Sequence, residues 1–342
     1  MVNLDRLLQE LTQATGVGYG GSVRDIVAVQ LRDYGMQAQL HDDGSVIGHI
    51  PGDSSGGVMI ACHLDEVGFM VNRIDDAGRI GFSQVGGVDG RILPGQEVVV
   101  HGKRDLRGYI GAKPPHLMSP DERKKVIPSE QLFIDCGLPV NDVKKQVTLG
   151  DYVTLNNSYR RLKHDYRSVK SLDNRASVAC GLCAMKALAA ADHTLDIYFV
   201  ATSQEEFSGL GARIHSYRLP ITYAVVVDVT FGQQYGSCET ESFALDKGPA
   251  IGRGATIPEK LYNLFVRAAK DLEIPYQIEA LVADTHTDAE SIAFNKEGIP
   301  TGLVSIPVRY LHTPVEVVCL KDIDRASRLI IQFIALLEVE RQ

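Results

Sequence analysis

The most informative segment of the sequence is Asp196-Ile197-Tyr198-Phe199-Val200-Ala201, which leads after one residue into Ser203-Gln204-Glu205-Glu206. The apolar run is short, rich in β-branched and aromatic residues, and ends abruptly, which predicts a buried strand. In open α/β sheets, ligands bind outside the carboxyl ends of strands. Of two adjacent carboxylates there, one can hold a metal and the other can move protons. A solvated acidic loop is the alternative, and it would explain an isolated Glu-Glu pair better.

Composition and charge limit the classes of protein to which the chain can belong. Its 342 residues are enough for a large core and for more than one domain. The formal net charge is −8 and no basic block occurs, so we expect no nucleic-acid partner. No apolar run is long enough to span a bilayer, and the first residues lack a signal-peptide pattern, so we expect no membrane partner. Six scattered cysteines are typical of a reduced, cytoplasmic protein.

The chain contains two kinds of sequence pattern. Strand and helix patterns, such as a strand over 58–62 and a long helix over about 176–191, occupy both ends of the sequence. Between them, short strands are separated by Gly- and Pro-rich turns, and helical periodicity is scarce. The sequence therefore predicts an α/β domain formed by 1–66 and 163–342, with a β-rich domain inserted over 67–162.

Other predicted strands also end at residues of the kinds that bind metals. His63 follows the strand over 58–62, and Asp65 could accept the other N–H of its imidazole, although a surface histidine is the alternative. Asp228 ends the apolar run over 223–227, where a charge is costly unless it is paired or bound to a metal. His312 lies just past the strand over 302–307.

Two aspartates stand at predicted helix starts, where two interpretations remain open. Asp173 precedes the helix over 176–191, so it could be an N-cap or a carboxylate that bridges two metals. Asp288 could equally cap a helix that runs to about Phe294 or bind a ligand, and His286 is expected to line the cleft.

A few other polar residues receive structural predictions. Ser22 is a plausible N-cap for the helix that follows it. His101, His116 and His164 have no neighbours at ligand spacing, and we interpret them as surface residues.

The candidate site therefore consists of six strand-end groups: His63, Asp173, Glu205, Glu206, Asp228 and His312. Two histidines and several carboxylates form a mixed N/O set suited to Zn²⁺ or another first-row divalent ion. One bridging carboxylate with two further ligands for each ion would hold a pair of metals about 3.5–4 Å apart and leave one carboxylate as a base. This set of groups is typical of a hydrolase that activates water between two metals.

The same residues also resemble a known family. Ordered matches such as His63-Leu64-Asp65-Glu66, Leu172-Asp173-Asn174-Arg175 and Gln204-Glu205-Glu206 extend over nearly the whole chain. Further matches lie at 86–89, 93–96, 110–116, 228–230, 287–289 and 306–316. The chain resembles the cytosolic dinuclear metallo-aminopeptidases of the MH clan, which include glutamyl, leucyl and deblocking aminopeptidases and the TET peptidases.

The resemblance implies a role for each group in the candidate site. Asp173 would bridge two divalent ions, Zn²⁺ or Co²⁺, with His63 and Asp228 completing one metal site. Glu206 and His312 would complete the other. Glu205 would be the catalytic base, and Asp65 would orient His63.

The resemblance also implies a fold and an assembly. The fold would be a mixed central sheet flanked by helices, as in zinc peptidases, with a PDZ-like or barrel-like β-rich insert. That insert would mediate dimer contacts, from which a tetrahedral dodecamer could be built. The expected substrates are peptides with a free N-terminus.

Departures from the family pattern border the cleft, at Thr285-His286 and at Phe207-Ser208. They leave the preferred N-terminal residue open. The alternatives to an aminopeptidase are a metal-dependent deacylase of N-acyl amino acids and an inactive binding homologue.

Overall fold

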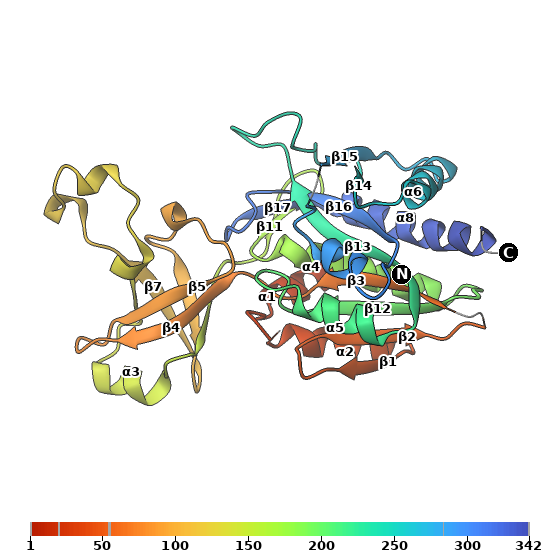
Figure 1. Ribbon diagram of the computed structural model, residues 1–342. Helices are drawn as coiled ribbons and strands as arrows, with labels where there is room; N and C mark the ends of the chain where they lie inside the picture. The colour runs from red at the N-terminus through yellow and green to blue at the C-terminus, as the bar shows by residue number, and fades with distance from the viewer. Residues whose placement is uncertain (1, 20, 54–55, 283, 341–342) are drawn as a thin grey trace.

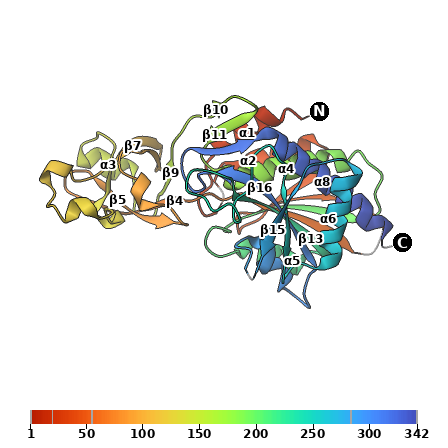
Figure 2. The ribbon, with the colours of Figure 1, turned by 90° about the horizontal axis from the view of Figure 1, so that it is seen from above.

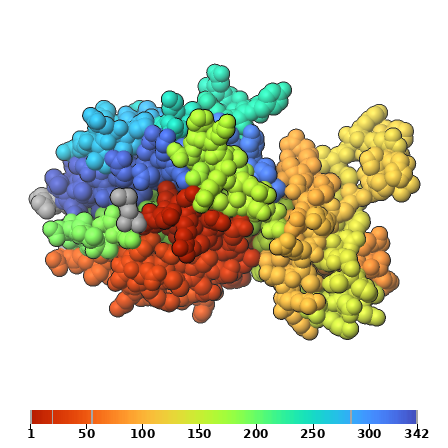
Figure 3. Space-filling model, turned by 180° about the vertical axis from the view of Figure 1, so that it is seen from behind, coloured from red at the N-terminus to blue at the C-terminus, as the bar shows by residue number. Residues whose placement is uncertain are grey.

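The computed structural model describes residues 2–19, 21–53, 56–282 and 284–340 of the chain. It has two parts, an α/β domain and a small β-barrel that stands beside it (Figure 1). The view from behind shows the barrel and its long loop, residues 112–132, projecting from the α/β domain (Figure 3). Both parts were predicted from the sequence, and the α/β class is confirmed.

The large sheet contains eleven strands. Their bounds are β1 Gln37–Leu40, β2 Val46–Ile50, β3 Gly57–His63, β10 Arg160–Arg161, β11 Tyr166–Val169, β12 Asp196–Thr202, β13 Ile221–Phe231, β14 Ala250–Gly254, β15 Gln277–Leu281, β16 Thr301–Arg309 and β17 Glu316–Cys319. The main path runs β1-β2-β12-β3-β13-β16-β17-β11-β10, and β14 joins it at β16 with β15 beyond. The central strands β12, β3, β13 and β16 are parallel, whereas β2 and β17 pair with them in the antiparallel sense. The sheet is therefore mixed, as expected.

Strand β3 lies at the middle of this sheet and is buried along its whole length. Successive side chains of a strand point to opposite faces. Val58, Ile60 and Cys62 accordingly enter one core, while Met59 and Ala61 enter the other. A strand covered on both faces needs an apolar run instead of alternation, which explains why 58–62 is uniformly hydrophobic.

Helices cover both faces of the sheet (Figure 2). Their bounds are α1 Leu4–Gln13, α2 Val23–Asp33, α4 Leu172–Leu188, α5 Leu210–Arg218, α6 Glu259–Asp271, α7 Asp288–Ala293 and α8 Leu320–Val339. Side chains of α1, α2, α4, α6 and α8 share the larger core, and those of α5 and α7 share the smaller one. Helix α4 packs closely on β12 because a Cβ at Gly181 would lie 2.3 Å from a ring carbon of Phe199. Within the described residues, no helix is both long enough and apolar enough to cross a membrane.

The inserted region forms a closed barrel with strand order β4-β5-β8-β7-β6-β9. Its elements are β4 Gly68–Ile74, β5 Ile80–Val85, β6 Glu97–His101, β7 Asp105–Gly111, β8 Phe133–Asp135, β9 Tyr152–Leu155 and the helix α3 Val140–Gln146. Phe69 and Phe82 meet edge to face in its own core, with 4.9 Å between ring centroids. The barrel confirms the β-rich insert, and the limits 67 and 162 stay a prediction.

Ser22 occupies the N-cap position of α2, as predicted, but it makes no capping hydrogen bond, because its hydroxyl accepts the backbone N–H of Thr15 instead. Another local prediction was wrong. His101 is not a surface residue without partners: its ring nitrogens lie 2.8 Å from an Asp105 oxygen and 2.9 Å from the Thr154 hydroxyl. Both partners come from strand pairing, since residue 105 pairs with 101 across a hairpin and β9 lies on the other side. His116 and His164 are exposed, as expected.

Candidate metal centre

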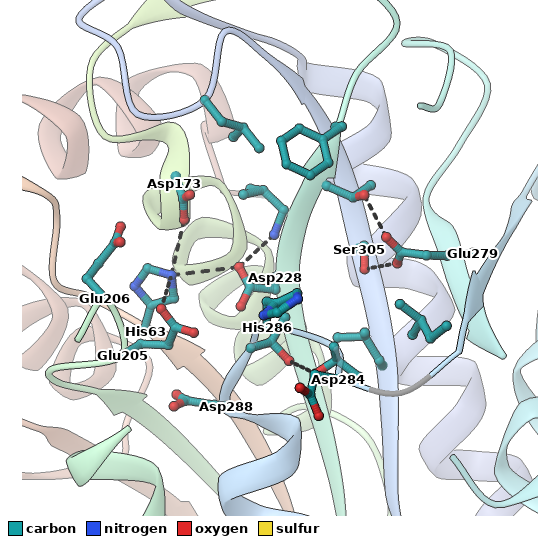
Figure 4. A pocket seen from close by; sticks show the side chains of 18 of the residues that line it. His63, Asp173, Glu205, Glu206, Asp228, Glu279, Asp284, His286, Asp288 and Ser305 are labelled. Atoms are coloured by element: carbon teal, nitrogen blue, oxygen red, sulfur yellow. Dashed lines mark hydrogen bonds and ion pairs between the residues drawn. The ribbon is translucent and has the colours of Figure 1, made fainter. Parts of the chain in front are cut away.

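Parallel strands bring the predicted site residues to one edge of the sheet. His63 is the last residue of β3 and pairs in register with Thr202, the last residue of β12. Glu205 and Glu206 follow Thr202 by only a few residues, and Asp228 projects from the neighbouring strand β13. The close view shows these side chains converging at the end of a pocket (Figure 4).

Asp173 lies between the two histidines. One of its oxygens is 3.1 Å from Nε2 of His63, and the other is 3.2 Å from Nε2 of His312. His63 Nε2 is also 3.7 Å from a carboxylate oxygen of Asp228, and His312 Nε2 is 3.4 Å from one of Glu206. The structure thus brings together all five residues that the sequence analysis named as ligands, in two groups that share Asp173.

Glu205 is the sixth member and lies on the His63 side of the cluster. A carboxylate oxygen of Glu205 is 3.8 Å from His63 Nε2. The side chain lines the pocket beside Phe207 and Ser208, so it is accessible to a molecule bound there. The position is compatible with a proton-transfer role.

Asp65 fixes this edge from underneath, and it is fully buried. Its carboxylate accepts the backbone N–H groups of Glu205 and Glu206, at 3.1 and 3.3 Å. The Nδ1 atom of His63 is 3.2 Å from the backbone carbonyl of Asp65 and 3.6 Å from its carboxylate. Asp65 therefore contacts His63 through two groups and also holds the loop of the two glutamates, which the sequence analysis did not anticipate.

Glu316 is a positioning residue that sequence reasoning missed. Its buried carboxylate accepts the backbone N–H of Asp173 at 3.2 Å and that of His312 at 2.8 Å. The only available sequence signal was its spacing, four residues after His312 in an otherwise apolar strand start. A carboxylate buried at such a place needs hydrogen-bond donors close by.

The barrel also reaches the site. Strand β5 ends just before Gly86 and Gly87, and a Cβ at Gly87 would lie 3.5 Å from Nδ1 of His312. The backbone of Gly87 also acts on this ring, because it raises the pKa of His312. The insert therefore contributes to the surroundings of one candidate ligand.

Burial and mutual repulsion strongly raise the pKa values of the two adjacent glutamates. Burial raises the pKa of Glu205 to about 9, and the charges of Asp228, Asp288 and Asp173 act in the same direction. Burial, with the charge of Asp173, also raises the pKa of Glu206 well above its usual value. These acids would hold protons unless a cation stood among them.

In the two histidines and Asp173, by contrast, the pKa shifts favour the charged forms. Burial would lower the pKa of His63, but the carboxylates of Asp228 and Asp173 outweigh it and raise that pKa. Asp173 is buried too, yet its hydrogen bonds to His312 and His63 hold its pKa well below the usual range. The pKa of His312 is raised as well, because its contacts with Asp173 outweigh burial, so the carboxylates of this cluster favour positive charge beside them.

The donor set fits divalent cations. Two imidazole nitrogens and three carboxylates are ligands of the kind that Zn²⁺ and related ions prefer. The atom Oε1 of Glu206 is buried without a hydrogen-bond partner, as an oxygen awaiting a cation would be. Among the described residues, no Lys or Arg forms an ion pair with these carboxylates. The nitrogen and oxygen atoms of His63, Asp173 and Glu206 already lie within 4.8 Å of one another.

The structure separates the two interpretations of Asp288. The N-cap of α7 is Thr287, whose hydroxyl accepts the backbone N–H of Ala289. Asp288 instead accepts the hydroxyl of Thr202 at 2.5 Å, and its other oxygen is buried without a partner. Burial raises its pKa to about 7. Asp288 and His286 both line the pocket.

Two further polar groups escaped the sequence analysis. Glu66 belongs to no ligand cluster but is buried against Lys170, whose Nζ is 2.6 Å away, with Ser171 and Arg175 beside it. Separately, His41, Asp43 and His215 lie together, and Nε2 of His215 is 3.1 Å from Asp43. Both groups join segments distant in sequence, so no local pattern indicated them.

The chain is similar to known proteins over almost its whole length. Residues 44–329 match the model of the M42 glutamyl aminopeptidase family. The lysyl aminopeptidase of Pyrococcus furiosus is 32% identical over 333 residues, which cover 94% of each chain. A putative aminopeptidase of Acetivibrio thermocellus is also 32% identical, with 96% of this chain and 97% of the relative covered.

Solved structures agree with this assignment. An aminopeptidase from the archaeon Desulfurococcus kamchatkensis has a TM-score of 0.90 at 34% identity, covering 97% of this chain and 94% of the other. A TET aminopeptidase from a marine sediment thaumarchaeon has a TM-score of 0.93 at 28% identity, with 99% and 98% covered. The TET1 peptidase of Pyrococcus horikoshii, which can assemble into a tetrahedron or a large octahedral shell, has a TM-score of 0.85 at 28% identity, with 96% and 98% covered.

The expected resemblance is thereby confirmed, together with the type of fold that it implied. With a centre whose donors suit divalent ions, the chain belongs to the M42 glutamyl aminopeptidase family and is a metal-dependent aminopeptidase.

Proposed function

We propose that the protein removes residues one at a time from the free N-terminus of peptides, using two divalent ions, Zn²⁺ or Co²⁺. Asp173 would bridge the ions, with His63 and Asp228 on one and Glu206 and His312 on the other. The observation that carries this proposal is the position of Asp173, which directs one oxygen toward each histidine. When bound, such a pair of ions supplies Lewis acidity that activates water and polarises the scissile carbonyl.

Glu205 is assigned as the base that takes a proton from the attacking water and passes it to the leaving amine. Its carboxylate lines the pocket beside the cluster, and among the described residues no donor forms a hydrogen bond with it. Burial raises the pKa of Glu205 in the metal-free site. The positive charge of two bound ions would favour its carboxylate form, which is the form that can accept a proton. Asp65 positions it through the backbone.

Recognition of a free amine follows from the charge of the pocket. Asp288 and Glu205 both present carboxylates near the cluster. A protonated amine is attracted there, whereas an N-acylated terminus brings no positive charge and more bulk. The expected substrates are therefore unblocked peptides.

The decisive experiment compares a peptide with its N-acetylated twin, after the protein has been loaded with Zn²⁺ or Co²⁺. Mass spectrometry should record stepwise loss of N-terminal residues from the free peptide and no change in the capped one. Release of acetate from the capped peptide would instead identify a deacylase. If neither peptide is changed by protein with verified metal content, the protein is an inactive binding homologue.

A homo-oligomer built on dimer contacts of the barrel, and extending to a tetrahedral dodecamer, is also proposed. The barrel and its long loop expose large apolar side chains, which is typical of interaction surfaces. They are Tyr109, Leu117, Val126 and Leu149. Light scattering at micromolar concentration should give a mass well above that of one 37.4 kDa chain, and a monomer throughout would contradict the proposal.

A cytoplasmic location is proposed from the cysteines. All six are free, and Cys180, which has a close sequence neighbour in Cys183, lies fully buried in α4. A reducing compartment suits such a chain. Fractionation of the native cells should recover the protein with cytoplasmic markers, and recovery from the medium would contradict this.

A further inference from the structure

The pocket that contains the candidate metal centre has a second polar wall. The cavity measures about 980 Å³, and the cluster around His63 occupies one end. Glu279 and Ser305 face each other across from that cluster (Figure 4). None of the roles assigned above uses Glu279.

Strand pairing explains how Glu279 reaches this wall. On the edge strand β15, Glu279 pairs in register with Gly252 of β14, which has no side chain to stand in the way. The carboxylate leans across β14 and accepts the hydroxyl of Ser305 on β16 at 2.5 Å. Its other oxygen accepts the hydroxyl of Thr230 on β13 at 2.6 Å. The acid is thus held at a fixed place inside the pocket.

Glu279 has no positive partner. Among the described residues, no Lys, Arg or His forms an ion pair with it, and its hydrogen bonds are to two neutral hydroxyls. Burial raises its pKa, because the hydroxyls only partly replace water. A carboxylate offers about four lone-pair sites, so two remain for a donor that enters the pocket. A cationic group is the partner that such an acid lacks.

The spacing from the metal centre suits an amino-acid side chain. Asp228 and Thr230 lie two residues apart on β13, and hence on the same face. Two residues of strand span about 6.6 Å, and Ser305 pairs in register with Asp228. A residue with its amine at the cluster would direct its side chain along this wall. The four-carbon stem of lysine, or the longer arm of arginine, has the reach to place its charge at Glu279.

We propose that Glu279 is the recognition group of a subsite for the positively charged side chain of a peptide's first residue, lysine or arginine. This inference rests on the aminopeptidase function proposed above, and it adds the class of N-terminal residue. Glu279 selects the substrate and touches no reacting bond, so it is a specificity residue.

The charges around the cavity agree with this assignment. Of its lining residues, eight are Asp or Glu, and one, Arg213, is a fixed cation. Two of the acids, Glu241 and Asp284, are exposed to solvent, and Asp284 follows Glu279 closely in sequence. Arg213 is exposed as well and is bonded to Ser291, on the opposite helices α5 and α7. An acidic N-terminal residue held by Arg213 is the competing assignment.

The test measures kcat/KM for lysyl, arginyl, leucyl and glutamyl anilides with the metal-loaded protein. The wild type should prefer the two basic substrates. Glu279→Gln keeps the size and the hydroxyl contacts but removes the charge. It should reduce kcat/KM for lysyl and arginyl anilides by about 10- to 100-fold, the usual range for a hydrogen bond to a charged group. The leucyl rate should stay within about twofold.

Two controls separate selection from damage. Glu273→Gln makes the same charge change on the exposed turn before β15, outside the pocket, and should leave the ranking of substrates unaltered. An independent readout is binding: L-lysine should inhibit, or raise the Tm, more than norleucine, its uncharged analogue, and Glu279→Gln should abolish that difference.

Three results would overturn the assignment. One is a wild-type preference for leucyl anilide. Another is a preference for glutamyl anilide that Arg213→Gln removes. The third is an equal fall of all four rates in Glu279→Gln, which would make Glu279 part of the reaction or the scaffold. If no anilide is cleaved, the aminopeptidase function fails on that count, and the comparison of lysine with norleucine still decides the subsite.

Discussion

The buried carboxylate of Asp65 accepts the backbone N–H of Glu205, with 3.1 Å between Oδ1 and the nitrogen. Its second oxygen accepts the N–H of Glu206. Because Asp65 lies only two residues after His63, one side chain ties the end of β3 to the loop after β12. The relative positions of a candidate ligand and the candidate base therefore depend on this single acid.

Asp65→Asn should test that dependence. The amide keeps one acceptor oxygen but turns an NH₂ group toward a backbone N–H, so one of the two loop contacts becomes repulsive. We expect metal affinity or activity to fall by about 10- to 100-fold, the range for groups that orient metal ligands. Titration with Co²⁺, followed by absorption, and a circular dichroism spectrum would distinguish loss of the site from loss of the fold.

Glu205 and Glu206 should respond differently to the same change. Glu205→Gln cannot accept a proton, so kcat should fall by about 10²–10⁴-fold or more, while two metals per subunit remain. Glu206→Gln removes a candidate ligand and should lower metal stoichiometry as well as activity. Elemental analysis beside kcat for both variants provides the comparison. Loss of metal from Glu205→Gln, with both ions retained in Glu206→Gln, would exchange the two roles.

Removal of metal should abolish activity and lower stability together. Without cations, the buried carboxylates around Asp173 repel one another, as the raised pKa of Glu206 indicates. A ligand that binds only the folded state stabilises it by about 2.7 kcal/mol at one hundred times its Kd. Chelation should therefore lower the Tm, and Zn²⁺ or Co²⁺ should restore both Tm and activity. Full activity of protein that is metal-free by elemental analysis would exclude a metal-dependent reaction.

The buried pair of Glu66 and Lys170 should matter for stability at neutral pH. Burial opposes ionisation of Glu66, but the charges of Lys170 and Arg175 outweigh it and hold its pKa below the usual range. A lowered acid pKa gives stability that is present above the unfolded value of about 4.3 and is lost as pH falls through the folded value. Glu66→Gln leaves Lys170 buried without its counter-charge.

We therefore expect Glu66→Gln to reduce the free energy of unfolding by about 3–5 kcal/mol at pH 7. The difference from the wild type should shrink as pH falls below about 4. The matched control is Glu10→Gln, because the Arg6–Glu10 pair is exposed and should contribute less than about 1 kcal/mol. Urea unfolding at several pH values measures both variants, and equal effects of the two would contradict the argument.

Residues at the ends of apolar strands were the part of the site that the sequence could predict. His63, Glu205 and Asp228 each follow a run that only a buried strand explains, and parallel strands deliver their ends to one edge. The same reasoning predicted the α/β class and the β-rich character of the insert. These inferences succeed because burial leaves a local pattern of side chains.

Contacts between distant segments left no such pattern. Glu316 bonds to backbone groups of Asp173, which lies far away in the chain, and Gly87 reaches His312 from the barrel. Glu279 belongs to an edge strand of alternating exposure, where a charged residue looks like any solvated one. Its contacts with Ser305 and Thr230 lie on other strands, and its register partner on β14 is Gly252. Pairing register, which fixes such meetings, is a property of the whole sheet.

The five candidate ligands are scattered from His63 to His312. Ribosomes add about 5–20 residues per second and domains fold from the N-terminal side first. However early β3 and the barrel fold, a growing chain holds an incomplete set of donors until residue 312 has emerged. Hydrolytic competence therefore has to wait until the last of the five donors, His312, has emerged and joined the others.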